Sequence, residues 1–264
     1  MKDRYTFGDN DRAADRLTLL ARAFAPSSVH LLERVRPSRP PRVVDLGCGP
    51  GYTTALAHRA LGARETWGLD ASERLVARAR AEFGAGSTHG DNLEFGVHDV
   101  TKSPLPVSGV DVFYARYLLT HLAEPRTVLD ACAGAASGDS QLVLEDNCSL
   151  ESKDPLFAAY YERVRTMHAH YGQDMFVGER LPEIAAGTPW AVVGFERTRI
   201  DLDGRVMAQL HALNVRTWRS DPFATSAFDA AEIDAMAGAL DDVASGVRSA
   251  PQVTCTMGQA VLRL

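Results

Sequence analysis

The sequence lacks the features that mark a secreted, membrane-spanning or metal-binding protein. It has 4 cysteines among 264 residues, and no two of them form a C-x-x-C pair. Scattered cysteines of this kind are typical of reduced thiols in a cytosolic protein. No apolar stretch approaches the roughly 18–20 residues that a membrane span needs, and the first residues lack the apolar core of a signal peptide. We therefore expect a cytoplasmic protein with no membrane partner and no metal.

Positive charge is also scarce. Lys and Arg together number 28 against 34 Asp and Glu, which gives a net charge of -6 at pH 7. Binding to nucleic acid requires a basic face, so we expect no nucleic acid as a partner. The exception is the stretch 1–42, where basic residues outnumber acidic ones. We interpret it as a solvated helical segment, with a tether to an anionic partner as the alternative.

What the sequence does contain is an alternation of short apolar runs with helical patterns. A hydrophobic share of 45% is ordinary for a globular protein. The predicted strands are 42–46, 65–69, 93–98, 110–115, 140–145, 190–201 and 252–264. The predicted helices between and after them are 52–61, 72–83, 121–135, 155–171, 205–217 and 229–245. This order is typical of an α/β fold with a Rossmann-like, doubly wound sheet, here of seven strands.

Two helical regions lie outside this alternation. Residues 11–35 have helical spacing that is interrupted by Pro26, so we predict two N-terminal helices there. The helices at 205–217 and 229–245 form an insertion before the last strand. We expect both regions to cap the same face of the sheet.

A glycine-rich turn follows the first predicted strand. The sequence from Val43 to Thr54 has the pattern D-x-G-x-G-x-G, with Gly47, Gly49 and Gly51. Glycines allow tight turns and let a ligand approach the main chain. The pattern departs from the dinucleotide fingerprint G-x-G-x-x-G. Asp45 precedes the first glycine by two positions, and its carboxylate is suited to an ammonium group rather than a pyrophosphate.

Two further acids follow the next two predicted strands. Asp70 ends the second strand, where a carboxylate can accept hydrogen bonds from both hydroxyls of a ribose. Asp99 ends the third strand, where it can accept from an adenine amine while the backbone of Val100 meets the ring. The three loops together predict a site for an adenosine that carries an amino acid.

These spacings resemble the class I S-adenosylmethionine-dependent methyltransferases, over roughly residues 40–150. The segments Asp111–Leu122 and Leu142–Asn147 are similar to that family's fourth and fifth strands. Within the family, the chain is most similar to small-molecule methyltransferases of the quinone-biosynthesis and trans-aconitate types. The resemblance implies S-adenosyl-L-methionine as cofactor. The cofactor-binding residues that it implies are Tyr5, Asp45, Gly47, Cys48, Gly49, Gly51, Asp70, Ala71, Asp99, Val100 and Arg116.

The same resemblance implies a division of the chain. We expect an N-terminal helical cap at 1–41, a cofactor-binding Rossmann-like core at 42–150, and a C-terminal part of the sheet with helical lid insertions at 151–264. All three belong to one domain. The N-terminal helices are also suited to form a homodimer.

Two residues are candidates for catalysis. His121 follows the fourth strand and has the right intrinsic pKa for a general base, or it packs against the next helix. Asp146 ends the fifth strand and is suited to accept a proton, or it caps a helix. Asp146 and Asn147 also match half of a metal site in catechol enzymes. Arg116 stands in the other half, where it would repel a cation, so we expect no metal.

Contacts to the acceptor are predicted from the aromatic and polar residues of the C-terminal part. Tyr160, His168 and Tyr171 lie on the helix 155–171, and Asn214 and Trp218 lie in the helical insertion. The alternative is that these side chains belong to the core.

The predicted function is methylation of a small molecule at oxygen, nitrogen or carbon. The prevalence of Arg over Lys indicates a GC-rich genome and favours a role in specialised metabolite biosynthesis. One alternative is a cyclase or related enzyme that uses the cofactor only as a fixed charge. Another is a scaffold for a second methyltransferase. The intact cofactor residues argue against this alternative, because a scaffold would have no need for them.

Overall fold

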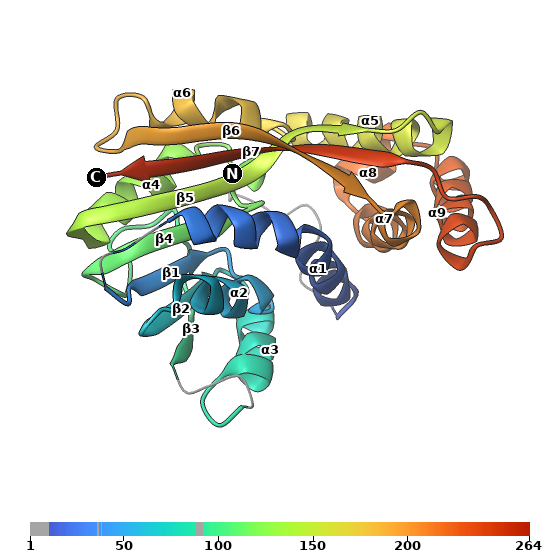
Figure 1. The fold of residues 1–264 in the computed structure, drawn as a ribbon. Helices are drawn as coiled ribbons and strands as arrows, with labels where there is room; N and C mark the ends of the chain where they lie inside the picture. Colours follow the sequence, from blue (N-terminus) through green and yellow to red (C-terminus); the bar gives the residue numbers. More distant parts are fainter. Residues whose placement is uncertain (1–10, 36, 38, 88–91) are drawn as a thin grey trace.

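The computed structural model describes residues 11–35, 37, 39–87 and 92–264. These residues form one seven-stranded sheet in the order β3-β2-β1-β4-β5-β7-β6 (Figure 1). The strands are β1 (Arg42–Leu46), β2 (Glu65–Asp70), β3 (Leu93–Val97), β4 (Val110–Arg116), β5 (Ala136–Glu151), β6 (Ala191–Leu202) and β7 (Val253–Arg263). β1 to β5 pair in parallel, whereas β7 runs antiparallel between β5 and β6. The predicted Rossmann-like sheet is confirmed.

Helices cover both faces of the sheet. They are α1 (Asp11–Arg34), α2 (Tyr52–Leu61), α3 (Glu73–Phe83), α4 (Arg126–Ala135), α5 (Pro155–His170), α6 (Leu181–Ala185), α7 (Gly204–Trp218), α8 (Pro222–Ala227) and α9 (Ala230–Ser245), with short 3-10 turns η1 (Leu119–His121) and η2 (Val177–Arg180). Leu32 of α1 and Ala57 of α2 pack on one face, against Val43 and Tyr114. Leu129 and Leu181 of α4 and α6 pack on the other face. The central strands read as continuous apolar runs because both of their faces are buried.

The prediction of two N-terminal helices is wrong, because α1 continues through Pro26. Proline removes one helical hydrogen bond, that of the carbonyl of Arg22. Both Arg22 and Pro26 are exposed, so water can solvate the freed carbonyl at little cost.

The segment after β4 also differs from the prediction of a helix over 121–135. The chain first makes the short turn η1, and α4 begins only at Arg126, with Pro125 at its N-cap. A proline is favoured at such a start because its missing N–H has no partner in a first helical turn. His121 therefore lies on a separate turn instead of on the helix.

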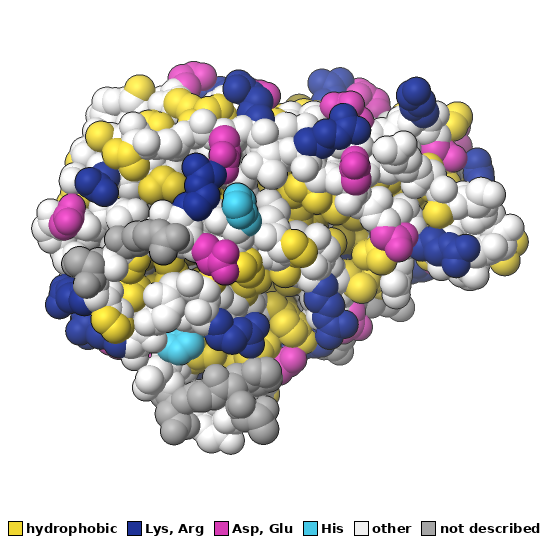
Figure 2. Space-filling view, viewed as in Figure 1, with side chains coloured by type: hydrophobic (Ala, Val, Ile, Leu, Met, Phe, Trp, Pro, Cys, Tyr) yellow, Lys and Arg dark blue, Asp and Glu magenta, His cyan; other side chains and the backbone are white. Residues whose placement is uncertain are grey.

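The predicted helical insertion between the last two strands is confirmed as α7, α8 and α9. Each of these helices begins at an aspartate whose carboxylate accepts from backbone N–H groups of the first turn, at Asp203, Asp221 and Asp229. The insertion packs with α5 beyond the far ends of the long strands β5 to β7, and α1 reaches across to α7 (Figure 1). Figure 2 shows hydrophobic side chains in the recess between the body of the sheet and these helices. In the described part of the chain, no helix combines the length and the apolarity needed to cross a membrane.

Candidate functional site: a two-part pocket at the strand ends

A pocket of about 1140 Å³ lies at the carboxyl ends of β1, β2 and β4. It has two parts. The lining residues within 47–53, 70–75 and 99–102 come from the ends of strands, the loops after them and the first turns of α2 and α3, and we call them the turn half. The lining residues of α1 and α7 and those within 117–122 and 147–175 form the helical half. The volume exceeds the roughly 300–1,000 Å³ of common small-molecule sites, so the pocket has room for two ligands side by side.

The turn half begins with the glycine-rich turn after β1. Gly47 and Gly49 have φ angles of 68° and 53°, which side chains rarely adopt. A Cβ atom on Gly47 would lie 2.9 Å from Cδ1 of Leu118. The turn therefore brings bare backbone to the pocket wall. Gly51 is not among the described lining residues, and it serves as the N-cap of α2.

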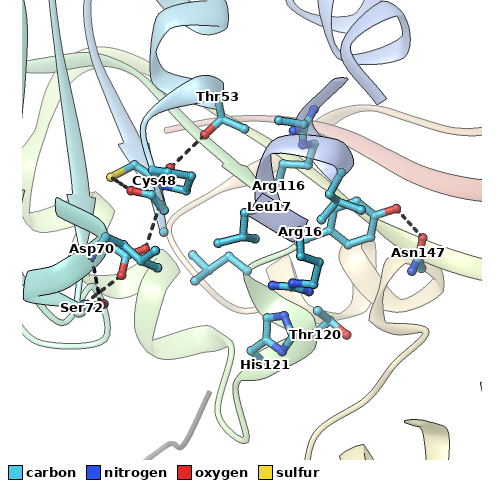
Figure 3. A pocket seen from close by; sticks show the side chains of 18 of the residues that line it. Arg16, Leu17, Cys48, Thr53, Asp70, Ser72, Arg116, Thr120, His121 and Asn147 are labelled. Carbon is cyan, nitrogen blue, oxygen red and sulfur yellow. Dashed lines mark hydrogen bonds between the residues drawn. The ribbon is translucent and has the colours of Figure 1, made fainter. Parts of the chain in front are cut away.

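Asp70 is fixed at the centre of the turn half (Figure 3). Its Oδ2 accepts a hydrogen bond of 2.9 Å from the N–H of Gly49, and its Oδ1 accepts one of 2.9 Å from the N–H of Ser72. Each carboxylate oxygen can accept more than one hydrogen bond. The carboxylate is therefore held in place and still suited to receive two hydroxyl groups from the pocket.

The other predicted residues of this half lie around Asp70. Cys48, Ala71, Asp99 and Val100 all line the pocket. Val100 is buried and offers an apolar surface next to the exposed carboxylate of Asp99, whose Oδ1 accepts from the N–H and the hydroxyl of Thr101. This combination suits a flat heterocycle with an amine at its edge. Tyr5 lies outside the described residues.

Asp45 was predicted to receive a ligand's ammonium group, directly or through water, and a contact through water stays a prediction. The residue is buried and is not among the described lining residues. Its Oδ2 accepts hydrogen bonds from the hydroxyls of Thr53 (2.6 Å) and Thr54 (2.7 Å). Burial raises the pKa of its carboxyl to about 6. In this structure Asp45 ties the end of β1 to the first turn of α2.

Arg116 stands at the junction of the two halves. Its side chain lines the pocket, and Nη1 donates a hydrogen bond of 2.9 Å to the hydroxyl of Ser28 in α1. Its charge also lowers the pKa of Asp45 against the effect of burial. The guanidinium is thus placed where a ligand in the turn half would extend toward the helical half.

Tyr117, the next residue, has a backbone strain that the sequence did not reveal. Its φ of 55° is rare for a residue with a side chain. The hydroxyl donates to Oδ1 of Asn147 at 2.9 Å, and the ring meets Phe24 edge to face with centroids 5.2 Å apart. Strain of this kind concentrates at functional sites. Here it accompanies a tyrosine that lines the pocket.

His121 lines the helical half, from the turn η1. Its ring lies 5.4 Å from the ring of His168. Burial lowers the pKa of His121 well below its usual value, and the nearby His168 and Arg16 lower it further. The imidazole is therefore neutral at pH 7 and has a nitrogen lone pair.

Asp146, the second predicted catalytic residue, is buried and not among the described lining residues. Its Oδ2 accepts from the N–H of Leu119 at 3.1 Å, at the start of η1. Its Oδ1 has no hydrogen-bond partner among the described residues, and burial raises the pKa of the carboxyl well above its usual value. The capping interpretation fits this geometry, so Asp146 positions the turn that carries His121.

The far wall of the helical half consists of α5 and α7. Tyr160 and Asn214 line it together, and Nδ2 of Asn214 donates to the Tyr160 hydroxyl at 2.6 Å. His168 also lines the pocket, with Nδ1 3.1 Å from the carbonyl oxygen of Thr120. Burial lowers the pKa of His168 to about 4. These three predicted residues therefore meet at one site.

Two predicted acceptor contacts do not reach the pocket. The hydroxyl of Tyr171 donates to the carboxylate of Asp221, at 2.7 and 2.8 Å from its two oxygens. Trp218 is fully buried and packs against Phe228 in the helical core. Neither is among the described lining residues, so the core interpretation holds for both.

Several lining residues were not predicted from the sequence. Arg16, Leu20 and Phe24 come from α1, and Met207 and His211 come from α7. Their spacing at intervals of four along each helix indicates only a buried face. The buried faces of α1 and α7 border a pocket only because of how the two helices approach each other.

Comparison with known proteins places this geometry in a known context. Residues 43–137 match the model of a family described as "Methyltransferase domain". The chain is 32% identical over 122 residues to trans-aconitate 2-methyltransferase of Methylobacterium radiotolerans. The aligned stretch covers 46% of this chain and 44% of that protein. The chain spans about half the length, or less, of the relatives that it matches.

Solved structures extend the similarity to nearly the whole fold. The YcgJ protein of Bacillus subtilis is 17% identical and superposes with a TM-score of 0.57 over 90% of this chain and 97% of that chain. Phosphoethanolamine N-methyltransferase 2 of Haemonchus contortus, solved with S-adenosylhomocysteine, is 13% identical, with a TM-score of 0.57 over 99% of this chain and 60% of that chain. At these identities the likeness concerns the fold alone.

Proposed function

The chain belongs to the class I S-adenosylmethionine-dependent methyltransferase family, and we propose that it transfers a methyl group from S-adenosylmethionine to a small-molecule acceptor. The observation that carries the proposal is the continuous pocket. One end has the fixed carboxylate of Asp70 beside a bare glycine turn, and the other end is a mostly apolar chamber between α1, α5 and α7. A methyl donor and its acceptor need to share one space in this way.

The residues of the turn half fit the cofactor. Asp70 would hold the ribose hydroxyls, and the adenine ring would lie on Val100 with Asp99 at its amine edge. Arg116, at the junction, would meet the carboxylate of the methionine portion. Cys48 and Ala71 complete the wall with small side chains.

The chemistry asks little of the protein beyond positioning. The cofactor supplies a methyl group on a positively charged sulfur, which is reactive toward an in-line nucleophile. The helical half would hold the acceptor near that methyl group and exclude water. Where the acceptor atom carries a proton, the neutral imidazole of His121 would accept it.

The test is an incubation of the purified protein with methyl-labelled S-adenosylmethionine and a metabolite extract, followed by mass spectrometry of the small molecules. We expect label in a new product, formed only in the presence of the protein. A protein that binds S-adenosylhomocysteine but leaves the label on the cofactor would contradict methyl transfer. If an unlabelled metabolite changed in mass or structure at the same time, the cofactor would act as a fixed charge. Specialised biosynthesis, a cytoplasmic location and a homodimer remain predictions.

A further inference from the structure

Two pairs of polar side chains that line the helical half are bonded to each other. Nδ2 of Asn214 donates to the hydroxyl of Tyr160 at 2.6 Å. The hydroxyl of Tyr117 donates to Oδ1 of Asn147 at 2.9 Å. These bonds occupy polar groups within the wall itself, so the two pairs offer little to a charge or a hydroxyl group on a ligand.

The remaining polar lining residues that the structure describes in this half, apart from His121, are almost completely buried. His168 and His211 are each 2% exposed, Arg16 is 3% exposed and Thr120 is 4% exposed. Nδ1 of His168 donates to the carbonyl oxygen of Thr120 at 3.1 Å, since a carbonyl oxygen only accepts. The atom Nδ1 of His211, which has no partner among the described residues, is enclosed as well. A ligand in the pocket therefore meets almost none of this polar surface.

The lining residues of this half that are partly exposed are mostly aliphatic. Apart from Tyr117 and His121, the partly exposed ones that the structure describes are all leucines, namely Leu17, Leu20, Leu118, Leu122 and Leu150. They come from α1, from the segment after β4 and from the end of β5, so they belong to three different walls of the chamber. The surface that the chamber offers to an acceptor is therefore chiefly leucine side chain.

We propose that the methyl acceptor is an uncharged, apolar molecule whose polar atoms are confined to the group that receives the methyl. Apolar surface that leaves water and packs against leucine side chains contributes favourable free energy in proportion to its area. A charge, or a hydroxyl group that finds no partner in the wall, would instead lose its hydration without replacement. The proposal excludes phosphorylated acceptors, zwitterions and acceptors with several carboxylates. It rests on the proposed function, because it names the chemical class of the acceptor for the same site.

The class of the acceptor is tested by calorimetric titration of the protein saturated with S-adenosylhomocysteine. The first probes are 1-hexanol, 1-heptanol and 1-octanol, for which we expect binding about fourfold tighter with each added methylene, as for a methylene buried in an apolar site. The second probes are 2-naphthol, 2-naphthoate and protonated 2-naphthylmethylamine. We expect both ions to bind at least about 10-fold more weakly than the naphthol, because each would lose hydration in the chamber. Ions that bind as tightly as the naphthol, or an affinity that does not rise with chain length, would overturn the inference.

The place of binding is tested with Leu20→Gln, which puts an amide into the leucine wall. We expect binding of 1-octanol to weaken about 10-fold. Leu19→Gln is the matched control, because Leu19 is partly exposed on the same helix and is not among the described lining residues. Equal affinities of the two variants for 1-octanol would contradict the assignment to this chamber. Binding of S-adenosylhomocysteine is measured in parallel. A wild-type protein that does not bind it would refute the proposed function, whereas intact cofactor binding without binding of the alcohols would refute this inference alone.

Discussion

The turn half and the helical half of the pocket are held together in different ways. In the turn half, backbone N–H groups of Gly49 and Ser72 bond directly to Asp70, and these groups lie within a short stretch of chain. In the helical half, side chains from distant helices bond to one another, as Asn214 does to Tyr160. The proposed cofactor would thus be bound at a carboxylate that local backbone geometry holds in place. A ligand particular to this chain would be bound by side chains, which can change without altering the sheet.

This contrast predicts that the helical half can be weakened without loss of the cofactor site. Trp218 is fully buried among α5, α7 and α9, so Trp218→Ala leaves a large cavity there. We expect a loss of about 3–5 kcal/mol in the free energy of unfolding, measured by urea denaturation. In the protein that remains folded, the affinity for S-adenosylhomocysteine should be close to that of the wild type. A large loss of that affinity would show that the two halves are not separable.

His121→Ala tests whether the helical half contributes to chemistry beyond binding. If His121 accepts a proton from the acceptor, kcat should fall about 100-fold, and the dissociation constant of S-adenosylhomocysteine should not change. The measurement is turnover of labelled cofactor on the acceptor, beside a cofactor titration. An unchanged kcat would assign His121 to packing against His168.

Asp70→Ala addresses the turn half in the same way. The loss of a carboxylate that would bind two hydroxyls is expected to weaken binding of S-adenosylhomocysteine by about 10- to 100-fold. The control is Glu94→Ala, which removes an exposed acid from the neighbouring strand β3. If Asp70→Ala binds as tightly as the control, the ribose assignment is incorrect.

The two halves should also respond to acid in opposite directions. Burial lowers the pKa of His168 to about 4. As the pH falls from about 6.5 toward 4, the unfolded chain takes up a proton that the folded protein does not, and stability decreases. Burial raises the pKa of Asp45 to about 6. Between pH 6 and about 4 the folded protein binds that proton first, and stability increases. Each group contributes at most about 1.4 kcal/mol per pH unit.

Two variants separate these contributions. His168→Asn is expected to reduce the loss of stability between pH 7 and pH 5, and Asp45→Asn to increase it. The readout is the free energy of unfolding in urea at both pH values. Identical pH dependence in the wild type and both variants would contradict the titration of these groups.

The difference between the halves also explains what the sequence could predict. Asp70, Asp99 and the glycine turn were found because each is tied to the end of a strand, and strand ends of a parallel sheet meet at one edge. Asp45 lies near the end of β1, as the sequence predicts, but its contacts depend on how α2 brings Thr53 and Thr54 to it.

The residues of the helical half depend on packing between segments far apart in the chain. Arg16 and His211 have the same local pattern as any buried helical position, and only the approach of α1 to α7 makes them neighbours of one pocket. The positive φ of Tyr117 likewise depends on the surrounding structure. Tyrosine rarely adopts such an angle, so the residue type at this position gives no sign of it. Pro26 indicates a helix end in the sequence, but the helix continues because this position is exposed on α1, and exposure depends on the fold.

The most direct test of the two-part pocket is a crystal structure of the protein with S-adenosylhomocysteine. The account predicts that the ribose hydroxyls bind to the carboxylate of Asp70 and that the adenine ring lies on Val100. The homocysteine portion should point to Arg116, with the helical half left open for the acceptor. An adenosine bound between α1, α5 and α7, with no contact to Asp70, would contradict the account.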